Sequence, residues 1–316
     1  MNRTGYVHDT RYLLHDTGPY HPEMPERLNA IYKGLADADL LGQLVRIPPR
    51  YAELRWIETV HTVDYIRRFE EACLAGRKML DFPDNQMCTD TYETALLAVG
   101  GVLEAARRLM DGEIDNAFCA VRPPGHHAET DTAMGFCYFN NIAICARYLQ
   151  QACGIARVGI IDFDVHHGNG TQHIFERDPT VFYYSSHEHP SFAFPGTGRA
   201  FEKGEGEGLG FTRNYPLLPG QGDAEYHELV ETDMIPAIDA FKPEVLLVST
   251  GFDAHAEDDM SGVNLSTDGY SWVMEQIVDL AKKHCNGRLI SILEGGYNLD
   301  RLGELASNHV RILLTR

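Results

Sequence analysis

The feature that most restricts the fold of this chain is a repeated pattern, in which short, continuous apolar runs alternate with stretches of helical periodicity. The apolar runs are 117–121, 157–161, 180–184, 244–248 and 288–293. Helices are expected over 91–110, 140–151, 224–241 and 267–284. Continuous rather than alternating hydrophobicity is typical of strands that are covered on both faces. The pattern therefore predicts an α/β fold whose mostly parallel sheet lies between layers of helices.

Length and composition favour one ordinary globular unit. The 316 residues are 44% hydrophobic and 23% charged, which excludes a disordered, collagen-like or coiled-coil chain. We find no repeat, no low-complexity tract and no Pro/Ser-rich linker, so residues 1–316 are expected to form a single domain. Seven cysteines without a C-x-x-C pair predict a reducing compartment rather than a disulfide framework.

Charge and hydropathy limit the partners. Forty-six acidic residues against 27 basic ones give a net charge of −19, a field that repels phosphate backbones and attracts cations. Direct binding of nucleic acid is therefore not expected. No apolar run approaches the ~18 residues of a membrane span, and the N-terminal segment lacks the apolar core of a signal peptide. We expect a soluble, cytoplasmic protein without a membrane partner.

Polar clusters follow four of the predicted strands. They are Arg122-Pro-Pro-Gly-His126-His127, Asp162-Phe-Asp164-Val-His166-His-Gly-Asn169, Ser249-Thr-Gly-Phe-Asp253 and Glu294-Gly-Gly-Tyr297. Ligands of parallel α/β sheets bind beyond the carboxyl ends of the strands. The four clusters should therefore meet at one edge of the sheet.

The segment from Asp162 to His166 has the composition of a metal site. Spacing by two places Asp162, Asp164 and His166 on one side of an extended segment. Alone, this pattern also fits a solvated acidic strand end, but Asp253 at the end of another strand adds a carboxylate that needs a cation to offset repulsion and desolvation. Two aspartates and one histidine leave a coordination position open, as in catalytic zinc sites. Zinc is the first candidate, and ferrous iron or manganese also suits this oxygen-rich set.

Proton carriers and an oxyanion donor are predicted beside the metal. His126 and His127 are a candidate acid–base pair, with Asp162 holding one imidazole and Asn169 orienting the other without adding charge. A loop histidine is otherwise most often merely exposed to solvent. Tyr297, behind two glycines, is either a turn aromatic or a phenol that swings over the metal to donate to a developing oxyanion.

Taken together, these motifs resemble the zinc-dependent histone deacetylase and acetylpolyamine amidohydrolase family, which has the arginase-like fold. The likeness also includes His21-Pro-Glu-Met-Pro-Glu-Arg27, Gly135-Phe-Cys-Tyr-Phe-Asn-Asn141, Phe194-Pro-Gly-Thr-Gly198 and Gly251-Phe-Asp-Ala254, and so covers nearly the whole chain. It implies a three-layer α/β/α domain around an eight-stranded, mostly parallel sheet. It also implies hydrolysis of N-acetyl or other N-acyl amines. Asn169, where many class I members have aspartate, indicates a class II-like, bacterial-type deacetylase.

The resemblance assigns roles to individual residues. Asp164, His166 and Asp253 match the zinc ligands, His127 the general base and later acid, and His126 its electrostatic neighbour. Asp162 and Asn169 match the partners of these histidines, and Tyr297 matches the oxyanion donor. In the substrate channel the matching residues are Gly135, Phe136, Phe194, Met260 and Asp84, and Arg27 resembles the arginine of an internal acetate channel.

Two structural potassium sites are implied as well. The first would use Asp162, Ser185 and the carbonyls of Asp164, His166 and Ser186. The second would use Phe175, Asp178, Val181 and Phe211. At the rim, Met260 replaces a leucine, and Glu257, Asp258 and Asp259 are expected to make the entrance acidic.

The sequence thus predicts a deacetylase that releases acetate from acetyl-lysine in proteins or peptides. The alternative is the same chemistry on acetylpolyamines or other small N-acyl amines. A catalytically silent acyl-lysine binding module is disfavoured because every expected catalytic residue is present. A ureohydrolase would need a second metal, for which we see no ligands. A homo-oligomer is left open.

Overall fold

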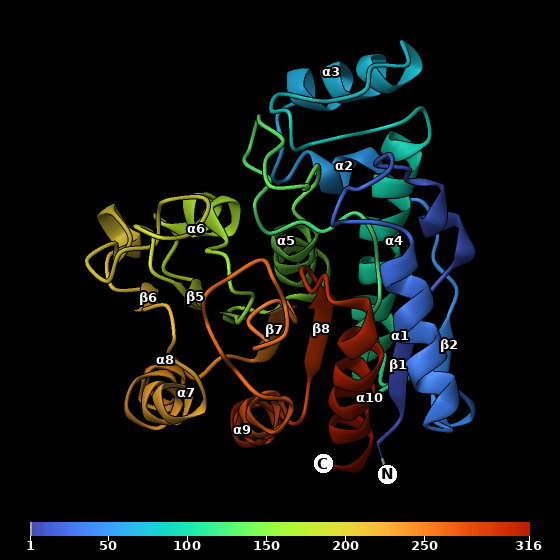
Figure 1. The fold of residues 1–316 in the computed structure, drawn as a ribbon. Coiled ribbons are helices and arrows are strands. Elements are labelled where there is room, and N and C mark those ends of the chain that lie inside the picture. The colour runs from blue at the N-terminus through green and yellow to red at the C-terminus, as the bar shows by residue number, and fades with distance from the viewer. Residues whose placement is uncertain (1) are drawn as a thin grey trace.

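A computed structural model describes residues 2–316 and shows one eight-stranded, fully parallel sheet between layers of helices (Figure 1). The strands are β1 (Thr4–Val7), β2 (Val45–Ile47), β3 (Asn116–Cys119), β4 (Val158–Asp162), β5 (Val181–Glu188), β6 (Thr212–Leu217), β7 (Val245–Thr250) and β8 (Leu289–Leu293). Their order in the sheet is β2-β1-β3-β8-β7-β4-β5-β6. The predicted fold class is confirmed, and the sheet is parallel throughout.

Ten α-helices connect and cover the strands. They are α1 (Glu26–Asp37), α2 (Leu54–Ile57), α3 (Val63–Leu74), α4 (Thr91–Met110), α5 (Asn141–Cys153), α6 (Asn169–Phe175), α7 (Asp223–Leu229), α8 (Ile235–Phe241), α9 (Thr267–Cys285) and α10 (Leu299–Thr315) within residues 2–316. Helices α1, α9 and α10 pack in a row on one face of the sheet, and α4 and α5 pack together on the other. The two ends of the chain lie close together in Figure 1. None of the helices in the described part is long and apolar enough to cross a bilayer.

Among the elements expected by residue range, one helix and one strand differ from the structure, and strands β1, β2 and β6 were not among those ranges. The helix expected over 224–241 is interrupted by a π-helical turn at Val230–Met234. Pro236 lacks the N–H that would continue the α-helical hydrogen bonds, so the chain loops out by one residue before α8 starts. Strand β5 continues four residues beyond the apolar run, through Ser185, Ser186, His187 and Glu188, which are all buried. Hydrophobicity could not reveal this polar half.

The central strands position the site. Asp162 is the last residue of β4 and pairs in register with Ser185 on β5 and Ser249 on β7. The strands β3, β8, β7 and β4 are neighbours in the sheet, and they are the four strands that precede the polar clusters. Because all run in the same direction, the four clusters leave the sheet at one edge.

Candidate active site

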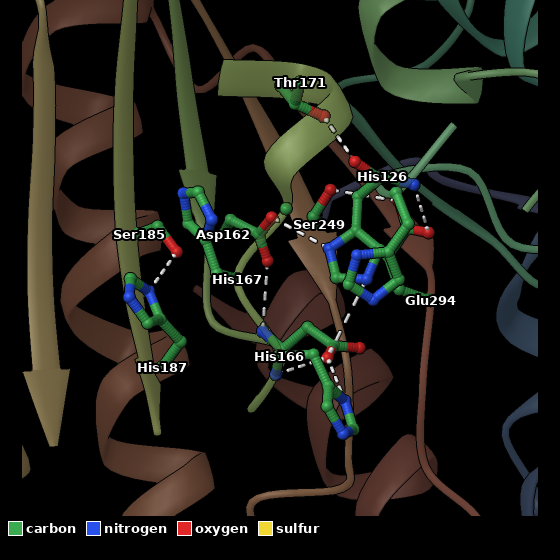
Figure 2. Close-up of polar contacts among 12 residues, drawn as sticks. His126, Asp162, His166, His167, Thr171, Ser185, His187, Ser249 and Glu294 are labelled. Carbon is green, nitrogen blue, oxygen red and sulfur yellow. Dashed lines mark hydrogen bonds and ion pairs between the residues drawn. The ribbon is translucent and has the colours of Figure 1, made fainter. Parts of the chain in front are cut away.

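Asp164, His166 and Asp253 form the one group among residues 2–316 whose atoms are arranged to hold a metal ion. Their ligand atoms lie within 4.8 Å of one another, and all three residues are buried. Nδ1 of His166 lies 3.2 Å from Oδ1 of Asp164 and 3.1 Å from Oδ2 of Asp253. Figure 2 shows His166 beside the polar residues that follow β4. The three residues that match the zinc ligands therefore meet, although β4 ends at Asp162, residues 164–166 form a bend instead of the expected extended segment, and Asp162 is not part of this group.

The electrostatics of this cluster favour a positive charge at its centre. Burial raises the pKa of Asp253 to about 6, with a further contribution from the negative charge of Asp164. Burial disfavours a charged His166, but hydrogen bonds to the two carboxylates outweigh it and raise its pKa to about 10. No lysine or arginine forms an ion pair with either carboxylate in the described chain. A divalent cation fits this donor set, since it would neutralise both aspartates and leave the imidazole neutral.

The backbone fixes the orientation of these carboxylates. Oδ2 of Asp164 accepts a hydrogen bond from the Gly295 N–H at 2.7 Å, and Oδ1 of Asp253 accepts one from Val165 at 3.0 Å. A Cβ atom on Gly295 would lie 2.0 Å from Oδ2 of Asp253. The first glycine of the pair before Tyr297 is therefore required by close packing against the metal cluster.

His126 is held in an anionic environment. Its Nδ1 lies 3.0 Å from Oδ2 of Asp162, the oxygen that also accepts a hydrogen bond from the Tyr183 hydroxyl at 3.0 Å. Oε2 of Glu294 accepts from the backbone N–H groups of Gly125 and His126 at 2.7 and 3.1 Å (Figure 2). Burial alone would lower the pKa of His126, but the charges of Asp162, Asp164 and Glu294 raise it to about 10. His126 is therefore suited to remain cationic at neutral pH.

His127 has the opposite character. Burial, with the nearby His126 and His166, holds its pKa well below the usual value. Its Nδ1 lies 2.8 Å from Oδ1 of Asn169, whose Nδ2 donates to Glu129 Oε1 at 2.5 Å. That second bond fixes the amide orientation, so Nδ1 of His127 carries the proton and Nε2 carries the lone pair. A neutral imidazole with a free Nε2 is what a general base requires.

The turn that carries Tyr297 is tethered rather than loose. Gly296 has φ +111°, and a Cβ there would lie 2.8 Å from Cβ of Phe252. Its carbonyl accepts from Nε of Arg27 at 2.7 Å, and the Arg27 guanidinium lies 4.9 Å from the centroid of the Tyr297 ring. In this structure the two glycines allow close packing around the turn, and a swing of the Tyr297 phenol stays a prediction.

A cavity of about 200 Å³ opens onto these groups. Its lining consists of Asp84, His127, Gly135, Phe136, His166, Phe194, Met260 and Tyr297. A Cβ on Gly135, which has φ +55°, would lie 2.4 Å from Cδ2 of His127. Phe136 also has a positive φ of 68°, and Oδ1 of the buried Asn85 accepts its backbone N–H at 2.7 Å. The structure thus places five of the predicted channel residues, all but Arg27, around one narrow, largely aromatic cavity.

Comparison with known proteins decides the family. The histone deacetylase domain matches residues 21–313. The chain belongs to the histone deacetylase domain family. A "probable deacetylase" of Archaeoglobus fulgidus is 40% identical over 94% of this chain and 82% of its own length. The "histone deacetylase-like amidohydrolase" of Pseudomonas aeruginosa is 36% identical over 94% of this chain and 82% of its own. The crystal structure of the HDA15 HD domain superposes with a TM-score of 0.94 at 36% identity, covering 99% of this chain and 88% of that one.

In this member of the histone deacetylase family, Arg27 lies behind the cavity rather than in its lining. Its side chain is fully buried, donates to the Gly296 and Glu294 carbonyls and forms an ion pair with Glu23 at 3.1 Å. Glu23 also forms an ion pair with Arg122. Glu23 and Arg27 are four residues apart, so spacing could have indicated this pair, whereas nothing local indicates that Arg122 also converges on Glu23.

Several residues of the two expected potassium sites already form hydrogen bonds with other residues of the protein. Asp162 binds His126 and Tyr183, and Ser185 Oγ lies 2.7 Å from Nδ1 of His187 (Figure 2). The carbonyls of Phe175, Asp178 and Phe211 accept backbone hydrogen bonds. Both potassium sites remain predictions.

The acidic rim needs one correction. Glu257 and Asp259 are exposed, but Asp258 is only 5% exposed and faces inward. Its carboxylate accepts three backbone N–H groups, including that of Tyr297. Sequence reasoning also gave no role to Glu129 or Glu294. Glu294 could have been noticed by its position, because it follows β8 as Asp164 follows β4.

Proposed function

We propose that this chain is a zinc-dependent deacetylase that hydrolyses acetyl-lysine in proteins or peptides and releases acetate and a free amine. The observation that carries the proposal is the 200 Å³ cavity, whose lining includes His166 of the metal-type cluster, the neutral His127 and Tyr297. Membership of the histone deacetylase domain family and relatives named as deacetylases and an amidohydrolase support the same chemistry.

Asp164, His166 and Asp253 would hold the zinc ion. When bound there, zinc supplies Lewis-acid polarisation of the amide carbonyl and lowers the pKa of a water molecule. Ferrous iron is the competing metal, because the ligand set contains two carboxylates and no thiolate. Structural potassium is proposed at the two predicted sites, and residues 1–316 are proposed to act as one catalytic domain.

Other residues of the chain would carry out proton transfer, oxyanion stabilisation and substrate binding. Nε2 of His127 takes a proton from water during attack and returns it to the leaving amine. His126, whose pKa is raised by the charges of Asp162, Asp164 and Glu294, helps burial to keep the pKa of His127 low. The Tyr297 hydroxyl donates a hydrogen bond to that oxyanion. Phe136 and Phe194 wall a slot that fits an extended alkyl chain, and Gly135 lets this chain pass close to His127.

Acetylpolyamines are the second candidate substrates. The exposed carboxylate of Asp259, the Asp84 side chain in the cavity lining and the net charge of −19 favour a cationic substrate body. A single cavity narrow enough for a linear chain suits acetylputrescine as well as acetyl-lysine.

A competition experiment separates these substrates. The zinc-loaded enzyme is given an acetyl-lysine peptide, acetylputrescine, acetylspermidine and longer acyl-lysines together, and each kcat/KM is measured along with the metal content. The proposal expects acetyl-lysine to be the preferred substrate. Preference for the polyamines would select the second candidate, and binding of all four without turnover would reveal a silent acyl-lysine module.

A further inference from the structure

The loop between β7 and α9 passes behind the turn that carries Tyr297, and one buried carboxylate joins the two segments. Oδ2 of Asp258 accepts the backbone N–H groups of Tyr297 at 2.7 Å and Asn298 at 3.0 Å. Oδ1 of the same side chain accepts the N–H of Met260 at 3.1 Å. Tyr297 and Met260 both line the cavity. A single side chain therefore fixes the backbone of two cavity residues that lie 37 positions apart in the sequence.

We infer that Asp258 is a positioning residue that sets the Tyr297 phenol and the Met260 wall relative to the metal cluster. The inference rests on the proposed function, because it acts through Tyr297 as oxyanion donor. Asp258 does not line the cavity and so does not touch the substrate. It acts on the reaction only through the two segments that it holds.

The geometry of the turn shows why this carboxylate is needed. The Gly295 N–H binds Asp164, and the Gly296 carbonyl binds Arg27. These contacts hold the inner half of the turn. The outer half, from Tyr297 to Asn298, has Asp258 as the acceptor of both its N–H groups in the described structure. Without that acceptor, two N–H groups would have to find water and the backbone under Tyr297 would move.

The other contacts between the loop and the turn lie at its inner half, where the Phe252 N–H donates to the Gly295 carbonyl at 3.2 Å, or at its periphery. The Asn298 side chain donates to the Glu257 carbonyl, and Glu257 forms an ion pair with Arg301 at 2.7 Å with both side chains about half exposed. Exposed ion pairs of this kind contribute little to the free energy of unfolding. Charge-assisted bonds from three N–H groups to a buried carboxylate are stronger, so Asp258 is the main tether of the outer half of the turn.

The test is a double-mutant cycle between Asp258→Ala and Tyr297→Phe in the zinc-loaded enzyme. Because a displacement of about 1 Å can reduce a rate by about 10²-fold, we expect Asp258→Ala to lower kcat on an acetyl-lysine peptide by about that factor while KM changes by less than about threefold. In the Tyr297→Phe background the same substitution should cost less than about threefold, since the hydroxyl that it positions is already absent.

A merely structural role predicts something else. Asp258→Ala would then lose the same factor in both backgrounds, and this result overturns the inference, as does a wild-type kcat for Asp258→Ala. The proposed function fails separately, through a Tyr297→Phe single variant that turns over like the wild type. If Asp258→Ala does not fold, Asp258→Asn carries the cycle, because it keeps one acceptor oxygen and the side-chain shape. Asp300→Ala, an exposed aspartate of α10, is the matched control and should leave kcat and KM unchanged.

Discussion

Two clusters of buried charge lie close to each other and differ in how their carboxylates are neutralised. In the arginine cluster, Glu23 is fully buried and is met by Arg27, Arg122 and, at 3.5 Å, His15. In the acid-rich cluster, four buried carboxylates surround three histidines, and no lysine or arginine of residues 2–316 forms an ion pair with them. The acid-rich cluster consists of Asp162, Asp164, Asp253, Glu294, His126, His127 and His166.

The pKa values record the difference. Burial alone would raise the pKa of Glu23, but Arg122, His15 and Arg27 hold it well below the usual value. Burial raises the pKa of Glu294 to about 7 and that of Asp253 to about 6, because no arginine is there to oppose it. The charge of Glu23 is neutralised by side chains of the protein itself, so the arginine cluster needs no ligand to be stable. The excess of carboxylates in the acid-rich cluster indicates that a cation from outside completes it.

The largest expected effect is therefore loss of the metal site. Asp164→Ala and Asp253→Ala should each lose zinc and activity together, because three protein ligands leave no redundancy. Metal analysis of the purified variants, paired with turnover of an acetyl-lysine peptide, measures both. Removal of zinc from the wild type by a chelator should reproduce the loss, and added zinc should restore activity to the wild type only. Full metal content with wild-type turnover in either variant would refute the assignment.

Tyr297→Phe should have the next largest effect. The hydroxyl is proposed to bind charge that appears only in the transition state, so kcat should fall by roughly 10² to 10³ with KM nearly unchanged. A turn tyrosine that only packs for stability would instead lower the melting temperature and leave turnover of the folded enzyme largely intact. Steady-state kinetics and thermal melting on the same preparation distinguish the two.

Tyr297→His sharpens that result. Acetyl-lysine turnover should fall, whereas a trifluoroacetyl substrate should suffer less because its carbonyl is already electrophilic. The ratio of the two kcat/KM values in variant and wild type is the measurement. Equal losses on both substrates would show that the hydroxyl does not stabilise the oxyanion.

The two histidines of the acid-rich cluster should differ in importance. His127→Ala should lower kcat by at least about 10²-fold with zinc retained, as is usual for the loss of a general acid–base group. His126→Ala should be milder, since His126 acts on charge rather than on the transferred proton. Rates close to wild type for both variants would contradict the proton-transfer scheme.

The contrast between the clusters also explains what the sequence could and could not predict. Asp164 and His166 were identified because a strand's period of two puts them on one side, and Asp253 because parallel strands end at one edge. The bounds of α4 match the expected 91–110 because its apolar periodicity is a local property of the sequence. The roles of Glu23 and Asp258 were not predicted, because Arg122 and the N–H groups of Tyr297 and Asn298 are distant from them in the sequence. Local patterns reveal what one segment contributes, whereas convergence of separate loops needs the structure.

The smallest effect on activity is expected in the arginine cluster. Glu23→Gln keeps the shape of the side chain but removes its charge, leaving Arg27 and Arg122 buried without a counter-ion. Breaking a buried pair in this way costs about 3–5 kcal/mol of the free energy of unfolding. Zinc content should be unchanged, and kcat of the folded variant should fall by less than about tenfold, because Arg27 keeps its bonds to the Glu294 and Gly296 carbonyls.

The pH dependence of that variant gives the sharpest test of the comparison. The pKa of Glu23 is lowered in the folded protein, so the charged carboxylate stabilises the fold above its unfolded pKa of about 4.3. This stabilisation is lost as pH falls through the lower folded pKa, where the protonated acid resembles glutamine. Chemical denaturation should therefore show a constant difference between wild type and Glu23→Gln from pH 8 to about pH 5 and a shrinking one in stronger acid. A difference that persists undiminished in acid would mean that Glu23 stabilises the fold by packing, and the arginine cluster would then no longer be a charge-neutralised counterpart of the metal site.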